Sequence, residues 1–147
     1  MTLEEIRSLI RDVPDFPKPG ILFKDITPVL ADPAAFRATI DTLAETVAPL
    51  RADGILAIES RGFIFGAALA TRAGLPLQLV RKRGKLPRES FSVEYELEYG
   101  IDHLEMHKDA VRTGDHTPQL LDRFSKMGWP KPASTRLASW RKAIAGE

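Results

Sequence analysis

Residues 54–80 read GILAIESRGFIFGAALATRAGLPLQLV, and this stretch decides the fold. It opens with an unbroken apolar run, residues 54–58, which is typical of a buried parallel strand. A turn follows, and the alanine-rich residues 63–73 predict a helix that ends at Gly74. Residues 75–80 form a second apolar strand. The order strand, helix, strand predicts a βαβ unit, and therefore an α/β protein with a parallel sheet.

The composition is that of one ordinary soluble domain. The chain has 147 residues, of which 44% are hydrophobic and 28% charged, and its formal net charge is +1. This balance allows a single core and gives no general attraction to nucleic acid. The absence of cysteine excludes disulfides and thiolate chemistry. No apolar run could span a membrane, and the charged N-terminus is unlike a secretory signal, so we expect a cytoplasmic protein.

Before residue 54 the sequence predicts two helices with an irregular segment between them. Thr2 and Glu5 have the spacing of a capping box, and Asp32 followed by Pro33 predicts a second helix start. Phe23 lies in the irregular segment between them. Its ring could stack on a planar base while neighbouring backbone groups bind the edge of that base. The alternative is that the ring anchors its own loop in the core.

Two loops that favour anions follow the two strands of the βαβ unit. The turn 59–62 carries Arg61 and a glycine at a helix start, and residues 81–88 contain five basic side chains. Because both loops follow the carboxyl ends of strands, we expect them on one rim of the sheet, where a polyphosphate could bind between them. The alternatives are a tight turn with a surface arginine, and a solvated or RNA-contacting basic loop.

Residues 93–101 alternate between apolar and polar side chains, which predicts a strand or hairpin. The alternation places Glu94, Glu96 and Glu98 on one face. A carboxylate there could act as an acid or base, or the three glutamates could simply line the solvent-exposed face of an edge strand. His103 and His107 could bind a metal if they lay on a helix, but no further ligands are evident, so we expect no metal site built by the protein.

Four motifs in this order resemble the adenine phosphoribosyltransferase family. They are residues 15–28 (DFPKPGILFKDITP), 59–66 (ESRGFIFG), 81–87 (RKRGKLP) and 95–100 (YELEYG). The resemblance covers residues 1–115. It implies transfer of a phosphoribosyl group from 5-phosphoribosyl 1-pyrophosphate to adenine, giving AMP and pyrophosphate in purine salvage. It also implies Mg²⁺ with the pyrophosphate substrate and a homodimer.

The resemblance also implies roles for individual residues. Phe23 would stack on adenine, while the backbone at Leu22 and Lys24 would bind its edge. Glu98 would shuttle a proton at adenine N7, and Tyr99 would help to close a lid. The pyrophosphate-binding residues would be Glu59, Ser60, Arg61 and Gly62 of the turn, with Arg81, Arg83 and Lys85 of the basic loop.

The tail, residues 116–147, departs from the family pattern. Members follow the turn at Gly114 with an apolar strand, two adjacent aspartates and a glycine-rich loop that wraps the ribose 5-phosphate. Here only Asp122 and Gly128 remain, and Pro118 would remove a donor from a central strand. We therefore expect a type I phosphoribosyltransferase-like parallel sheet with flanking helices in residues 1–115, incomplete at its C-terminal side, followed by a divergent tail.

The change of composition near His116 suggests a change of reading frame, a hypothesis that sequencing the gene would test. The tail leaves two functional interpretations open. The chain is either a family enzyme with a disrupted ribose-phosphate site, or a non-catalytic, dimerising module that binds adenine, AMP or pyrophosphate. A nucleic-acid regulator is a weaker third interpretation, because the basic loop has few aromatic residues.

Overall fold

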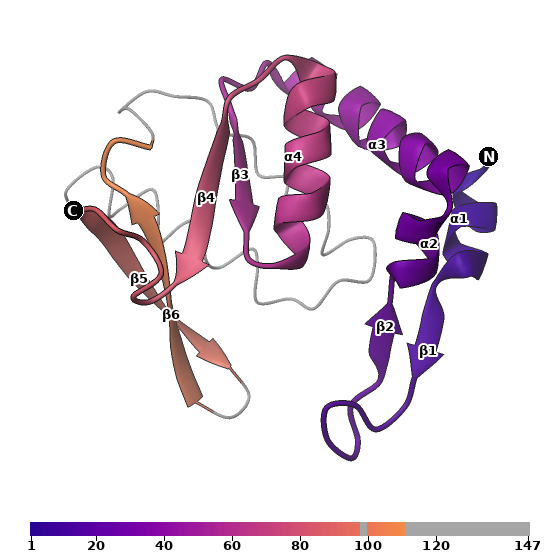
Figure 1. Ribbon diagram of the computed structural model, residues 1–147, viewed down its shortest axis with the longest axis horizontal. Helices are drawn as coiled ribbons and strands as arrows, with labels where there is room; N and C mark the ends of the chain where they lie inside the picture. The colour runs from indigo at the N-terminus through magenta and orange to yellow at the C-terminus, as the bar shows by residue number, and fades with distance from the viewer. Residues whose placement is uncertain (98–99, 111–147) are drawn as a thin grey trace. The chain divides into compact units, whose positions relative to one another are not determined.

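The computed structural model describes residues 1–97 and 100–110, and it divides the chain into two compact units between Thr46 and Val47. The first unit runs in the order helix, two short strands, two helices (Figure 1). Its elements are α1 (Leu3–Leu9), β1 (Arg11–Val13), β2 (Phe23–Asp25), α2 (Thr27–Ala31) and α3 (Pro33–Val47), the last of which crosses the boundary.

Local hydrogen bonds confirm both predicted helix starts in the first unit. The Thr2 hydroxyl accepts the Glu5 N–H, and the Glu5 carboxylate accepts the Thr2 N–H at 2.7 Å, which completes the capping box. Asp32 Oδ1 accepts two N–H groups from the first turn of α3, at 2.8 and 3.0 Å. A small core of Ile6, Val29 and Ala35 packs between the helices.

The second unit is built on a four-stranded sheet with the order β3-β4-β6-β5. Strands β3 and β4 are parallel, which confirms the βαβ unit, whereas β4–β6 and β6–β5 are antiparallel. The described sheet is therefore mixed. The antiparallel direction of β5 and β6 follows from the short link that joins them into a hairpin. Its elements are η1 (Ala48–Leu50), β3 (Ile55–Ile58), α4 (Arg61–Ala73), β4 (Leu77–Lys82), β5 (Ser90–Leu97) and β6 (Gly100–His107) (Figure 1).

Alternate residues of the sheet face two different environments. Val80, Val93, Leu104 and Met106 are buried together in one cluster, and this cluster joins the hairpin to the βαβ unit. The neighbouring positions Ala57 and Leu77 face α4, where Gly66 lies against them. No helix in the described part of the chain is long and apolar enough to cross a membrane.

Gly66 sets the distance between α4 and the sheet. A Cβ atom at this position would lie 2.6 Å from the Cβ of Ala57 and 3.4 Å from Leu77 Cδ1. We expect Gly66→Ala to destabilise the protein by about 1–3 kcal/mol, because overpacking outweighs the better helix propensity of alanine. Urea unfolding would measure the change, and Ala68→Gly on the same helix serves as a control for propensity. Equal or greater stability of Gly66→Ala would contradict the prediction.

Candidate functional site

The turn between β3 and α4 places its backbone at the carboxyl end of the sheet. The Glu59 N–H donates to the carbonyl of Val80 at 2.9 Å and so continues the β3–β4 ladder past the end of β3. The Glu59–Ser60 peptide bond is cis, and α4 begins at Arg61. The first N–H groups of a helix favour an anion, and this helix start adds the charge of Arg61. The turn is therefore chemically suited to a phosphate group.

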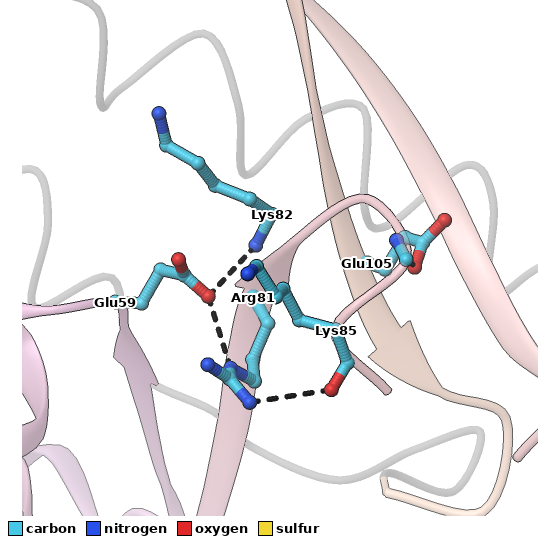
Figure 2. Close-up of polar contacts among 6 residues, drawn as sticks. Glu59, Arg81, Lys82, Lys85 and Glu105 are labelled. Atoms are coloured by element: carbon cyan, nitrogen blue, oxygen red, sulfur yellow. Dashed lines mark hydrogen bonds and ion pairs between the residues drawn. The ribbon is translucent and has the colours of Figure 1, made fainter. Parts of the chain in front are cut away.

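Glu59 links this turn directly to the basic loop. Its Oε2 atom accepts the Arg81 Nε–H at 2.9 Å and the Lys82 backbone N–H at 3.0 Å (Figure 2). The Glu59 side chain is only 14% exposed and that of Arg81 34% exposed, so solvent weakens this ion pair less than it would on an open surface. The expectation that the two loops meet on one rim is confirmed.

Arg81 also stabilises the conformation of the basic loop through a hydrogen bond within the loop. Its Nη1 atom donates to the Lys85 carbonyl at 3.2 Å, and its guanidinium carbon lies 5.9 Å from the centroid of the Phe63 ring. The loop turns tightly, with the Lys85 N–H donating to the Lys82 carbonyl at 3.3 Å. Gly84 adopts φ +76°, which favours glycine at that position.

A second carboxylate, whose role the sequence pattern does not reveal, holds the loop on its other side. Glu105 Oε2 accepts the Gly84 N–H at 3.0 Å, and Figure 2 shows Glu105 across the loop from Glu59. Glu105 is the register partner of Arg81 in the β4–β6 pair. On a strand, Glu105 shares a face with His103 and His107, but the register of the β4–β6 pair was needed to find its partner.

The segment predicted to bind adenine lies in the first unit, on and beside β2. Leu22 is 52% exposed, and the Phe23 ring meets the Phe16 ring edge-on, with centroids 5.2 Å apart. The Gly20 N–H donates to Asp15 Oδ1 at 2.7 Å and closes the preceding loop. Phe23 therefore does contact its own loop, while Phe16 beside it is 51% exposed. Adenine stacking by Phe23 stays a prediction.

Strands β1 and β2 fix the backbone around Lys24. Asp12 is its register partner, and the two side chains form an ion pair. The next residue, Asp25, accepts the backbone N–H and the hydroxyl of Thr27, both at 2.9 Å. These hydrogen bonds from Thr27 lower the pKa of the Asp25 carboxyl, because they favour its charged form. Both strands were missed in the sequence, which offered only three residues for each.

The residues predicted to act in catalysis, Glu98 and Tyr99, lie outside the described residues, as do Asp122 and Gly128 of the tail. The strands on either side of 98–99 are described, and they pair antiparallel, so of the strand or hairpin predicted over residues 93–101 the hairpin is observed, over the longer range 90–107. Two ion pairs tie the hairpin base together. Arg88 Nη1 lies 2.6 Å from Asp109 Oδ2, and Lys108 Nζ lies 3.2 Å from Glu89 Oε2.

The histidines of β6 lie on a strand, so the spacing that could bind a metal on a helix does not apply. His103 Nδ1 is 3.9 Å from Glu94 Oε1, and the buried Nδ1 of His107 has no hydrogen-bond partner. Among residues 1–97 and 100–110, no group of three or more acidic or histidine side chains could hold a metal ion.

Comparison with known proteins finds relatives of one kind that match most of the chain. No protein-family model matches it. An adenine phosphoribosyltransferase of Thermoanaerobacter sp. is 60% identical over 137 residues, which is 93% of this chain and 79% of the relative. The same enzyme of Synechococcus sp. is 49% identical over 142 residues, which is 97% of this chain and 83% of the relative.

Solved structures agree with the sequence relatives. The adenine phosphoribosyltransferase of Thermoanaerobacter pseudethanolicus has a TM-score of 0.76 and 59% identity, with 78% of this chain and 66% of that chain covered. The Giardia lamblia enzyme, solved with 9-deazaadenine, has a TM-score of 0.74 and 33% identity, with 78% and 64% covered. The chain spans about two thirds of the length of these solved relatives. Because these curated relatives match 93–97% of the chain and the solved structures share its fold, the chain belongs to the adenine phosphoribosyltransferase family, whose members are glycosyltransferases of purine salvage.

Proposed function

We propose that this chain binds adenine and 5-phosphoribosyl 1-pyrophosphate, the substrates from which the family forms AMP and pyrophosphate. The observation that carries the proposal is the junction of Glu59 with Arg81, which brings the turn 59–62 and the basic loop together. Adenine would lie on Phe23, with the backbone of Leu22 and Lys24 at its edge. The relatives solved with adenine or 9-deazaadenine support this choice of base.

The charges on the rim suit the departure of pyrophosphate. Breaking the bond between ribose and pyrophosphate builds negative charge on the leaving group and positive charge on the ribose. Fixed cations already in place stabilise that separation without reorganising. Arg61, Arg83 and Lys85 would supply them, with backbone N–H groups of Ser60 and Gly62 beside them. Mg²⁺ would enter bound to the pyrophosphate substrate and neutralise part of its charge.

Two residues of the hairpin link would complete the reaction. Glu98 would exchange a proton with adenine N7, and Tyr99 would help the lid exclude water, which competes with adenine for the ribose. We also propose that the protein works as a homodimer, in which cations of the basic loop could serve the partner's site. Sedimentation velocity would test the dimer, and a monomer at all concentrations would contradict it.

We further propose that turnover by this chain is very weak or absent. Residues 116–147 contain neither two adjacent aspartates nor a glycine pair. A 5-phosphate cradle normally supplies several charge-assisted hydrogen bonds, each worth about 1.5–3 kcal/mol. Without these hydrogen bonds, the substrate would be held by its pyrophosphate group alone. The ribose carbon that reacts would then no longer be oriented toward adenine.

The test is AMP formation from adenine and phosphoribosyl pyrophosphate with Mg²⁺, with Glu98→Gln as the control variant. We expect no turnover above that control from protein shown to be folded by circular dichroism. Turnover that Glu98→Gln abolishes would mean that the tail rebuilds a ribose-phosphate site. Isothermal titration with adenine, AMP and pyrophosphate then distinguishes an inactive chain that still binds these ligands from a chain that binds none of them.

A further inference from the structure

Two carboxylates border a loop whose proposed ligand is an anion. We infer that Glu59 and Glu105 are positioning residues, which shape residues 82–85 of the basic loop for pyrophosphate without touching it. This inference rests on the proposed function, and it removes Glu59 and Arg81 from the residues expected to contact pyrophosphate. The side-chain contacts are left to Arg61, Arg83 and Lys85, beside the backbone N–H groups of Ser60 and Gly62.

The geometry of Arg81 carries the first step. Its Nε–H is directed to Glu59 and one Nη–H to the Lys85 carbonyl, at 2.9 and 3.2 Å. A planar guanidinium bound in two directions is fixed in orientation, so Arg81 acts as a strut between the turn and the loop (Figure 2). A cation already paired with a carboxylate is also a poor partner for a second anion.

The backbone contacts carry the second step. Glu59 accepts the Lys82 N–H where the loop begins, and Glu105 accepts the Gly84 N–H at its tip. Glu59 follows β3 and Glu105 lies on β6, and these strands are the two neighbours of β4. The loop that extends β4 is therefore held from both adjacent strands, which limits how far its cationic side chains can move before a ligand arrives.

The inference predicts the sign of a charge-removal experiment. Glu59→Gln takes a negative charge away from an anion site, which by simple electrostatics should tighten the binding of pyrophosphate. If Glu59 positions the loop, binding weakens instead. We expect a loss of about tenfold, the lower end of what losing an outer-shell partner costs at metal sites. Isothermal titration of the full chain with inorganic pyrophosphate, with and without Mg²⁺, measures it.

Arg81→Lys tests the strut while conserving the positive charge. Lysine cannot donate in two fixed directions, so we expect a loss similar to that of Glu59→Gln. The double variant should lose little more than either single variant, because both changes break one unit. Additive losses would mean that Arg81 contacts the anion itself, and they would overturn the inference, as would tighter or unchanged binding by Glu59→Gln.

Two further variants guard against a general loss of fold. Glu89→Gln removes an exposed carboxylate that is paired with Lys108 at the hairpin base, and it should bind pyrophosphate like the unaltered chain. Glu105→Gln weakens the contact to Gly84 and should cost about threefold, which tests the loop even if Glu59→Gln does not fold. If the unaltered chain fails to bind pyrophosphate, the proposed function is overturned as well. If the unaltered chain binds pyrophosphate and the variants bind it equally well, only this inference is overturned.

Discussion

A chimera in which residues 116–147 are replaced by the corresponding part of the Thermoanaerobacter pseudethanolicus relative should form AMP at least about 10³-fold faster than the present chain. The family resemblance assigns the ribose 5-phosphate to that part, and three charge-assisted hydrogen bonds at about 1.5 kcal/mol each already give this factor. That relative is 60% identical over 137 residues, so the transplanted part should find a compatible sheet. A coupled spectrophotometric assay of pyrophosphate release would measure both rates.

The control for the chimera is the same fusion with Glu98→Gln, which should lose the gained turnover if the hairpin link supplies the proton shuttle. Pyrophosphate affinity offers a second control. It should be similar in the chain and the chimera, because the turn 59–62 and the basic loop are unchanged. Equal turnover by both proteins would show that the missing acidic pair and glycine loop do not limit this chain.

The βαβ unit could be predicted from the sequence because its signal is local. Two apolar runs separated by an alanine-rich segment with a terminal glycine allow few other structures, and Gly74 indeed adopts φ +65° at the end of α4. The short strands β1 and β2 could not be found in this way. Three residues carry too little periodicity, and the pairing of Val13 with Phe23 spans a loop with three prolines.

The rim of the candidate site was predictable in position but not in its contacts. Neighbouring parallel strands end at the same edge, so the turn 59–62 and the basic loop had to lie near each other. Which side chain pairs with which depends on register. Glu59 follows β3 by one residue and so reaches Arg81, a pairing that places a carboxylate where the motif alone suggested a pyrophosphate contact.

Hydrophobic burial explains how the hairpin is joined to that rim. Met106 is fully buried, and its register partners are Val80 on β4 and Phe91 on β5. The strands that flank Glu98 and Tyr99 are therefore attached to the βαβ unit at the centre of one apolar cluster.

Met106→Ala should therefore destabilise the protein by about 2–5 kcal/mol, because it removes transfer free energy and leaves a cavity among buried neighbours. Leu79→Ala is the matched control, since Leu79 lies in the same sheet but is 40% exposed, and we expect its cost to be below about 1.5 kcal/mol. Urea unfolding measures both. Hydrogen exchange should also speed up along β6 in Met106→Ala before the helix α4 opens. Equal costs for the two variants would show that the cluster does not hold the hairpin.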